Sequence, residues 1–319
     1  MTDEESSLRV GVDLGGTKTE AVVLRLQGSA SERSYQLLAR VRTATDRDRG
    51  YEHVVDNTAR LIDEAIAEAG LATRPKIGVG MPGSITMLAE DGSRSDVARV
   101  KNSNTTCLNG RPFRRDLSAR LGATIAFAND ANCFALAEAT FGEARGEVVF
   151  GVILGTGVGG GVVLCRDGTP WAWDGAQGIA GEWGHVSLDP AHGPPCYCGR
   201  RGCIEQYLSG PAIEARYAIR SNEALRLPAI AERANKGETH AIEVLDETAD
   251  LFGRALSIVI DVLDPAVIVV GGGVSNLEVL YRRGVREVAR WIFNDELRTK
   301  IVKHSLGDSA GVLGAALLP

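Results

Sequence analysis

Hydrophobic and polar residues change their spacing along this chain, and the changes predict strands that alternate with helices. Residues 76–81 form a short apolar run that ends at a Pro-Gly pair, as is typical of a buried strand. Residues 51–69 place apolar side chains three and four positions apart, which predicts an amphipathic helix. Such alternation favours the α/β class. The same reasoning predicts strands over 124–128 and 267–270, a helix after residue 128 through Phe141, a long helix over 241–262 and a polar surface loop over 89–98.

A sequence repeat links two parts of the chain. Residues 11–24 and 151–164 are identical at seven of fourteen positions, at an offset of 140 residues. Each segment has strand-forming residues on both sides of a Gly/Thr-rich turn and therefore predicts a β-hairpin. Two such hairpins indicate a duplicated α/β fold with a cleft between two domains, although two Gly/Val-rich hairpins can also resemble each other by chance. We expect a first domain over residues 1–122 and a second over 123–319, with the last helix, about 307–319, returning onto the first domain.

The composition is that of a globular protein with an excess of glycine. Of the 319 residues, 44% are hydrophobic, 24% are charged and 38 are glycine, whereas glycine averages about 7% of residues in proteins. The excess follows no repeat and therefore indicates many tight backbone turns. The net charge of −6 argues against a nucleic-acid-binding protein, which would usually carry a basic face.

Two segments bear on the location of the protein. Residues 1–7 are acidic, whereas a secretory signal begins with basic residues and continues with apolar ones. Residues 148–165 are 18 consecutive uncharged residues, long enough for a membrane helix. The six glycines among them favour two strands joined by a turn instead. We therefore expect a cytoplasmic protein without a membrane partner.

Glycine-rich turns provide candidate phosphate-binding sites, because backbone N–H groups can approach anionic oxygens closely where no side chain intervenes. The turn at residues 13–18 adds a carboxylate suited to magnesium, a hydroxyl and an ammonium group. A second turn lies at 155–161, and a third glycine run follows the strand at 267–270. The second turn is not a dinucleotide-binding fingerprint, because it continues as a strand and such a fingerprint must open a helix. The first turn is not a P-loop, because Thr17 follows Gly16 where a P-loop has its lysine. The three segments together predict a nucleotide clamp.

A group of cysteines predicts a structural zinc site. Cys196, Cys198 and Cys203 lie within eight residues, and His185 precedes them. Three thiolates and one imidazole form a closed tetrahedral set, which is typical of structural rather than catalytic Zn²⁺. Free thiols in an intracellular loop are the alternative.

Three carboxylates are candidates for catalysis or for binding a polyol, although each also has a purely structural explanation. Asp130 follows a strand and begins a helix, where sites of α/β proteins gather but where Asp is also a preferred helix cap. Glu182 and Glu205 lie close in sequence to the cysteine group, where they could accept hydrogen bonds from the hydroxyl groups of a polyol. Exposed glutamates are usually only solvated, so the spacing alone leaves these roles open.

Assembled, these motifs resemble the ROK family of bacterial sugar kinases and repressors, within the hexokinase–actin superfamily. The likeness extends over about residues 8–317 and rests on segments 13–18, 80–83, 129–132, 155–159, 181–185, 196–203 and 271–273. It implies a two-domain, duplicated ribonuclease-H-like fold of the actin and hexokinase type, with an interdomain cleft. It also implies a homodimer that binds a small sugar and ATP.

The resemblance further implies roles for individual residues. Asp130 would be the general base that takes the proton from the attacking sugar hydroxyl. His185 would use one ring nitrogen for Zn²⁺ and the other for a sugar hydroxyl. The implied sugar contacts are Pro82, Gly83, Asn104, Asn129, Asp130, Glu182, His185 and Glu205, and the implied zinc ligands are His185, Cys196, Cys198 and Cys203. The residues implied to bind ATP and Mg²⁺ are Asp13, Gly15, Gly16, Thr17, Lys18, Gly155, Thr156, Gly157, Gly159, Gly271, Gly272 and Gly273.

The choice of sugar rests on finer likenesses. Segment 100–113 is most similar to the fructokinase and mannokinase branch, and segments 116–121 and 129–135 are shared with N-acetylglucosamine kinases. The loop between His185 and Cys196 is shorter than in either branch. We expect an ATP-dependent phosphotransferase that acts on the 6-hydroxyl of a hexose, fructose first, with an N-acetyl-D-glucosamine kinase as the alternative. Polyphosphate is an alternative donor.

A non-catalytic, sugar-responsive regulator of the same family is the competing class of protein. Regulators of the family carry a DNA-binding segment before the first hairpin, and the acidic leader before Gly11 is too short for one. Asp130, the implied catalytic base, is also present. We therefore expect a sugar kinase rather than a regulator.

Overall fold

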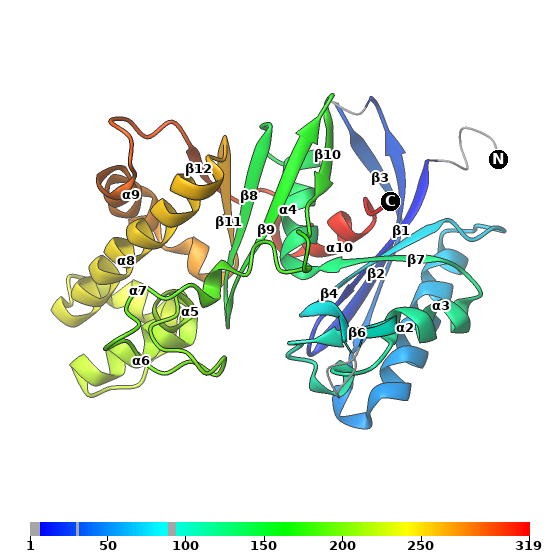
Figure 1. The fold of residues 1–319 in the computed structure, drawn as a ribbon, viewed down its shortest axis with the longest axis horizontal. Coiled ribbons are helices and arrows are strands. Elements are labelled where there is room, and N and C mark those ends of the chain that lie inside the picture. The colour runs from blue at the N-terminus through cyan, green and yellow to red at the C-terminus, as the bar shows by residue number, and fades with distance from the viewer. Residues whose placement is uncertain (1–6, 30–31, 89–93) are drawn as a thin grey trace. The chain divides into compact units, whose positions relative to one another are not determined.

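The computed structural model describes residues 7–29, 32–88 and 94–319, and the chain forms two compact units (Figure 1). The first unit consists of Met1–Gly142, Gly161–Ala180 and Leu306–Pro319, and the second of Glu143–Gly160 and Gly181–Ser305. The first unit is therefore assembled from three separate stretches of chain. The division after residue 122 that the sequence suggested stays a prediction.

Both hairpins predicted from the repeat are present. The first pairs β1 (Leu8–Leu14) with β2 (Lys18–Gln27) in antiparallel register. The second consists of β8 (Val148–Leu154) and β9 (Val158–Arg166), which are neighbours in one sheet. The apolar segment at 148–165 is thus two strands around a glycine turn, as expected. Within the described residues, no helix is long and apolar enough to cross a membrane.

A five-stranded mixed sheet with the order β3-β2-β1-β4-β7 forms the centre of the first unit. β4 lies parallel to β1, and β7 lies parallel to β4, whereas β2 and β3 are antiparallel to their neighbours. Because parallel strands end at the same edge of a sheet, the loops that follow β1, β4 and β7 are neighbours. The bounds of the three further strands are Ser34–Ala44 for β3, Lys76–Met81 for β4 and Ile125–Asn129 for β7.

Side chains alternate along β1 and β4 and give this sheet one bulky face and one glycine face. Val10, Val12 and Val79 are buried in a hydrophobic core with residues of α2 (Tyr51–Glu68) and α3 (Phe113–Leu121). Gly11 and Gly78 point to the opposite face, where a Cβ atom on either would collide with the backbone of the last helix, α10 (Ala310–Ala315). The missing side chains let α10 lie directly on the strands.

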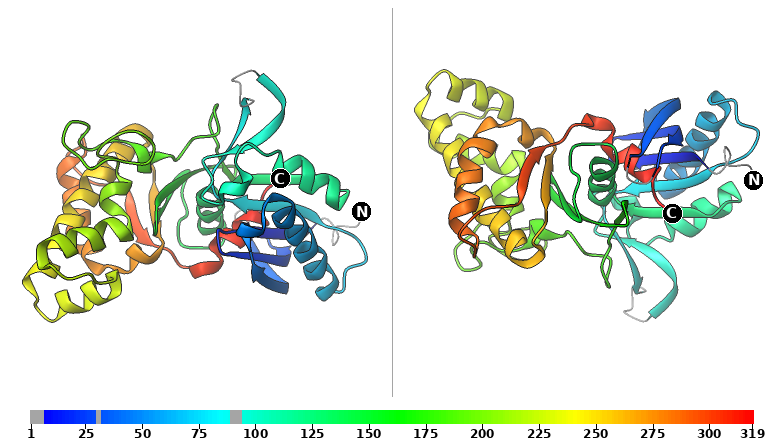
Figure 2. Two further views of the ribbon diagram at one scale, coloured as in Figure 1. Left: turned by 90° about the horizontal axis from the view of Figure 1, so that it is seen from below. Right: turned by 90° about the horizontal axis from the view of Figure 1, so that it is seen from above.

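Helix α4 (Asp130–Thr140) packs against α10 on the same face of the sheet, and both further views show the two helices side by side (Figure 2). A Cβ atom on Gly314 of α10 would collide with the carbonyl of Cys133 on α4. A Cβ atom on Gly80 of β4 would lie 2.9 Å from the Cys133 sulfur. Strand β4 and both helices therefore meet around one buried cysteine.

The second sheet has the order β10-β9-β8-β11-β12. β11 (Val267–Gly271) runs parallel to both β8 and β12 (Lys300–Lys303). β9 passes from the second unit into the first at Gly160, and β10 (Thr169–Ala172) follows it there. The helices of the second unit are α5 (Glu205–Leu208), α6 (Gly210–Ser221), α7 (Leu227–Asn235), α8 (Thr239–Leu263) and α9 (Val285–Trp291).

One predicted element is wrong in part. We expected a surface loop over residues 89–98, but residues 94–98 belong to β6 (Arg94–Lys101), which pairs antiparallel with β5 (Ser84–Leu88). Polar residues are compatible with a strand here, because a two-stranded sheet leaves side chains such as exposed Asp96 in solvent. Residues 89–93 of that prediction lie outside the described residues.

Candidate active site and cysteine cluster

The parallel strands of the first unit bring predicted site residues to one edge of its sheet. Asp13 on β1 is in register with Gly80 on β4, and Met81 on β4 is in register with Asn129 on β7. The segments that follow, which carry Gly15, Pro82 and Asp130, therefore leave the sheet at the same edge, as sites of open α/β sheets usually do.

The side-chain amide of Asn129 joins two of these segments. Its Nδ2 donates to the carbonyl of Gly83 at 2.8 Å, and its Oδ1 accepts from the N–H of Ala131 at 2.8 Å. Asn129 is therefore the N-cap of α4, and Asp130 is the first residue of the helix. Oδ1 of Asp130 accepts from the same N–H at 2.8 Å, which holds the carboxylate at the positive end of the helix dipole.

The segment that carries Asn104 approaches the same edge from β6. Gly83 has a left-handed φ of 88°, and a Cβ atom there would lie 2.6 Å from the carbonyl of Lys101 and 2.8 Å from the N atom of Ser103. Only glycine allows this close approach. The backbone before Asn104 therefore packs directly on the turn that carries Pro82 and Gly83.

The first phosphate turn is held in place by Thr45, which follows β3. Thr45 Oγ1 donates to the carbonyl of Gly15 at 2.7 Å, and its N–H donates to the carbonyl of Thr17 at 2.9 Å. Within the turn, the N–H of Gly15 donates to the carbonyl of Lys18 at 3.0 Å. The shape of the turn is thus fixed without a ligand.

The charged groups of this hairpin are arranged around Glu20, which is buried. Glu20 accepts ion pairs from Lys18 at 3.5 Å, Arg40 at 2.6 Å and Arg42 at 2.9 Å. The ammonium group of Lys18, which was predicted to bind ATP, is therefore paired with a carboxylate. Glu20 lies opposite Asp13 across the hairpin. Burial and the Glu20 charge together raise the pKa of Asp13 to about 6, against the opposing effect of Lys18.

The second phosphate turn belongs to the second unit and is supported by Glu205. Oε2 of Glu205 accepts from the N–H of Val158 at 3.0 Å, and a Cβ atom on Gly157 would lie 2.8 Å from that oxygen. The carbonyl of Gly155 accepts from the N–H of Gly210 at 2.8 Å. Glu205, which was predicted to contact sugar, thus also fixes the backbone of the turn.

The third glycine run lies beside this turn, also within the second unit. Gly272 has a φ of 81°, and a Cβ atom there would collide with the carbonyl of Leu154 at the end of β8. Gly273 and Gly155 have open space where a side chain would be. The structure therefore brings together the second and third segments of the predicted nucleotide clamp.

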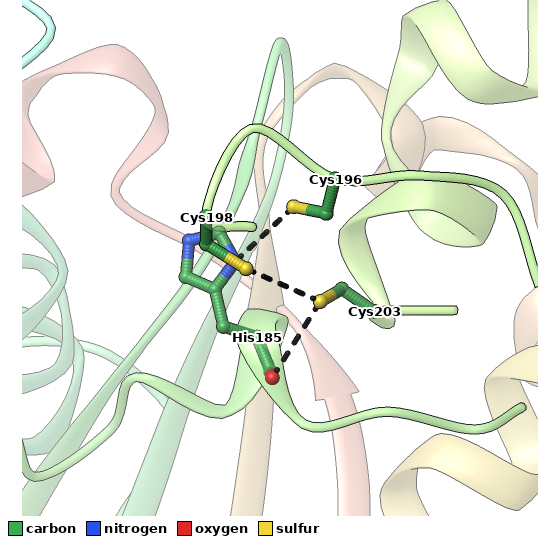
Figure 3. A group of neighbouring side chains, drawn as sticks. All are labelled: His185, Cys196, Cys198 and Cys203. Carbon is green, nitrogen blue, oxygen red and sulfur yellow. Dashed lines mark hydrogen bonds between the residues drawn. The ribbon is translucent and has the colours of Figure 1, made fainter. Parts of the chain in front are cut away.

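His185, Cys196, Cys198 and Cys203 converge in the second unit (Figure 3). Their ligand atoms all lie within 4.8 Å of one another, with 3.6 Å between Cys198 and Cys203 Sγ and 3.6 Å between Cys196 Sγ and His185 Nδ1. Two ligands of a tetrahedral zinc ion about 2.3 Å away would be roughly 3.8 Å apart, so the group has the right size. Burial and the neighbouring cysteines raise the pKa of Cys203, whereas hydrogen bonds from Arg200 and the other cysteines lower the pKa of Cys198 against the effect of burial. Of this close pair, Cys198 is therefore the one that favours the thiolate that a metal requires.

The second ring nitrogen of His185 has a partner that sequence reasoning did not identify. His185 Nε2 lies 3.0 Å from the hydroxyl of Tyr197, and the two rings are nearly perpendicular. The only signal in the sequence was the place of Tyr197 between two cysteines of the group. Glu182 lies in the same segment as His185, immediately before Trp183, and its side chain is exposed.

Asp174 is a second residue that sequence reasoning did not select. It lies on the stretch of chain that returns to the first unit, and its Oδ1 accepts from Asn132 Nδ2 at 2.7 Å. Burial raises the pKa of Asp174, although the bond from Asn132 opposes the shift. The contact fixes Asp174 beside the first turn of α4, two residues from Asp130 along the helix.

Comparisons with known proteins agree with this architecture. The model of the ROK family matches residues 9–319. An N-acetyl-D-glucosamine kinase of Photobacterium profundum is 38% identical over 318 residues, which cover 97% of this chain and 98% of that protein.

Two solved structures are similar over nearly their whole length. The ROK hexokinase of Thermus thermophilus has a TM-score of 0.80 at 32% identity and covers 97% of both chains. A ROK family glucokinase of Streptomyces griseus, in complex with glucose and AMPPNP, has a TM-score of 0.72 at 28% identity and covers 97% of this chain and 98% of its own. These matches confirm the expected hexokinase-type fold. The chain belongs to the ROK family and is one of its sugar kinases.

Proposed function

We propose that the protein is an ATP-dependent N-acetyl-D-glucosamine kinase that phosphorylates the 6-hydroxyl of its sugar. The observation that carries the proposal is the 38% identity to the Photobacterium profundum N-acetyl-D-glucosamine kinase over nearly the full length of both chains. It favours the alternative of the sequence analysis over fructose, which we had placed first. The AMPPNP bound to the Streptomyces griseus relative supports a nucleoside triphosphate as donor.

Asp130 is the proposed general base. The sugar hydroxyl gives its proton to the Asp130 carboxylate as its oxygen bonds to the γ-phosphorus, and the bond to the β–γ bridging oxygen breaks to release ADP. In a loose transition state the proton leaves late, so a carboxylate of ordinary basicity is sufficient. The bonds that Asn129 makes to Gly83 and Ala131 keep this end of α4 fixed while the proton moves.

Asp13 and the two hairpin turns are proposed to bind Mg²⁺ and ATP. Bound Mg²⁺ would neutralise charge on the phosphates, and the Asp13 carboxylate offers the oxygen ligands that Mg²⁺ prefers. The proposed ATP contacts in the first turn are Gly15, Gly16, Thr17 and Lys18. Lys18 must break its ion pair with Glu20 to bind a phosphate. The remaining proposed ATP contacts are Gly155, Thr156, Gly157, Gly159, Gly271, Gly272 and Gly273.

The sugar is proposed to contact side chains that can accept or donate several hydrogen bonds. Asn104, Asn129, Glu182, His185 and Glu205 supply such groups, and Pro82 and Gly83 supply backbone. One oxygen of Glu205 is engaged by Val158, so we assign the other to the sugar. His185 must exchange its contact with Tyr197 for a sugar hydroxyl. The homodimer expected from the family stays a prediction.

The cysteine cluster is proposed to bind structural Zn²⁺ through His185 Nδ1, Cys196, Cys198 and Cys203. Four ligands fill a tetrahedral site, so the metal would hold the segments of His185 and Glu205 together rather than act on substrate. The spacing of the four ligand atoms supports this assignment.

Phosphorylation of N-acetyl-D-glucosamine should be at least tenfold more efficient, as kcat/KM, than phosphorylation of fructose, mannose or glucose. ADP release with Mg·ATP measures this, and polyphosphate in place of ATP tests the donor. Preference for fructose would return the assignment to a fructokinase. Transfer to none of these sugars from either donor would contradict the proposed function.

Asp130→Asn should lower kcat by a factor of about 10² to 10⁴, the usual contribution of a general base. The sugar should still bind within a few-fold of the wild-type Kd, as measured by calorimetry, because the amide keeps the shape of the carboxylate. Asp167→Asn, at an exposed turn residue, is the matched control. Retained turnover would remove Asp130 from its role.

Asp13→Asn should abolish ATP turnover but stabilise the free protein at pH 8. A carboxylate whose pKa is about 6 in the folded chain and about 4 in the unfolded chain makes folding less favourable above pH 6, by roughly 1–3 kcal/mol. The gain should shrink as pH falls through 6 toward 4, where both states bind the proton. Urea unfolding of both variants at pH 8 and pH 5 measures it, and equal stabilities at pH 8 would contradict the electrostatic argument.

Cys198→Ser should lose bound zinc and raise the sugar KM, because the segment of His185 is no longer tied to the cluster. Metal content by mass spectrometry and KM by ADP release are the readouts. Cys165→Ser, at a cysteine outside the cluster, should change neither. One zinc per chain in the Cys198 variant would break the ligand assignment.

A further inference from the structure

Three polar atoms from two segments of the first unit, one around Arg47 and one at Asn104 and Thr105, converge beside Gly16 in the first phosphate turn. A Cβ atom on Gly16 would lie 3.3 Å from Arg47 Nη1, 3.6 Å from Asn104 Oδ1 and 3.8 Å from Thr105 Oγ1. The space next to the glycine is therefore lined by a guanidinium, an amide oxygen and a hydroxyl.

Arg47 is held at this place by an unusual backbone. It begins the short η1 helix (Arg47–Arg49), between Asp46 with a φ of 49° and Gly50 with a φ of 92°. Arg47 Nη1 donates to the carbonyl of Asn104 at 3.1 Å. Within the described residues this is the one hydrogen bond of the guanidinium, which forms no ion pair there, so most of its five N–H donors are available. Lys18, the other cation at the turn, is paired with Glu20.

Thr105 provides an independent indication that a ligand atom belongs here. The residue is fully buried, and its Oγ1 has no hydrogen-bond partner among the described residues. A buried hydroxyl without a partner is costly and rare in folded proteins. A ligand oxygen beside Gly16 would give Thr105 its missing partner once the side chains that now cover its Oγ1 move aside.

The chemistry of the lining selects the ligand. Arg47 and Thr105 donate hydrogen bonds, and the guanidinium adds positive charge, so their side of the space fits an anionic oxygen. Asn104 Oδ1 only accepts, so its side fits a hydroxyl group. Among the groups in the proposed reaction, a phosphoryl group beside a sugar hydroxyl meets both requirements.

We propose that Arg47 and Thr105 bind the phosphoryl group while it passes from ATP to the sugar. This inference rests on the proposed kinase function and adds two residues to it. Arg47 compensates the negative charge on the equatorial oxygens of the group in transfer. Thr105 donates to one of those oxygens, and Asn104 orients the attacking hydroxyl.

The test compares Arg47→Met and Thr105→Val with Arg49→Met, which removes another exposed arginine of the same helix. Arg47→Met should lower kcat about 10²-fold, the effect of removing one preorganised donor from developing charge, with the sugar KM within about twofold of wild type. Calorimetry should show that it also loses about tenfold in affinity for ATP and none for ADP, because only ATP carries the γ-phosphoryl group. Thr105→Val should lower kcat about tenfold, and Arg49→Met should behave as wild type.

Three outcomes would overturn the proposal. Arg47→Met could match Arg49→Met in kcat and in the ATP-to-ADP affinity ratio. Arg47→Met could raise the sugar KM without lowering kcat, which would show that Arg47 only positions Asn104 through their hydrogen bond. Arg47→Lys could fail to recover any kcat over the methionine variant, which would exclude a role for the charge.

The assay uses whichever sugar the wild-type protein phosphorylates fastest, so a wrong sugar assignment leaves this test intact. If the wild type phosphorylates no sugar, the proposed function fails, whereas the ATP and ADP affinities still decide whether Arg47 recognises the γ-phosphoryl group.

Discussion

The contact of α10 with the glycine face of the first sheet determines where Asp13 and Asp130 lie in the first unit. Gly11 and Gly78 have no side chains that would hold the strands and α10 apart, and Gly314 likewise lets α10 approach α4, so these backbones lie closer together than ordinary residues permit. Because α4 packs on α10, the same contact sets where Asp130 leaves the sheet. It also places Asp13 against the start of α10, where a Cβ atom on Gly311 would lie 3.2 Å from the Asp13 carboxylate. Burial at this point, together with the Glu20 charge, raises the pKa of Asp13.

A second feature common to both units is that three loops of the proposed site are each fixed by one side chain from another segment of the chain. Thr45 holds the first phosphate turn, Asn129 joins the Gly83 turn to α4, and Glu205 holds the second phosphate turn. Loops fixed in this way lose little further entropy when a ligand binds. Preorganised N–H groups are also the arrangement that stabilises charge developing on a phosphoryl group.

The sequence predicted those parts of the structure that depend on neighbours along the chain. Both hairpins, α2, α8 and β11 follow from periodicity and glycine turns, which are local signals, and the motifs were sufficient for the family. Contacts between distant residues were out of reach. Nothing local pairs Tyr197 with His185, Asp174 with Asn132 or Arg47 with Gly16, because each depends on how separate segments fold back. The position of Arg47 also depends on the left-handed backbone of Asp46, and a single aspartate in the sequence does not predict such a backbone. Polar spacing suggested a loop where the pairing of β5 and β6 produced a strand.

The division of the first unit among three stretches of chain has a consequence for how the protein is made. During translation, β1 and β4 leave the ribosome long before residues 306–319 exist, and the part of their glycine face at Gly11 and Gly78, which α10 covers, lacks that cover while the second unit is synthesised. Domains usually fold in the order in which they emerge, but here the earlier unit waits for the later one. A chain interrupted before residue 306 therefore lacks the helix that covers Gly11 and Gly78 and exposes strand backbone that the complete molecule buries.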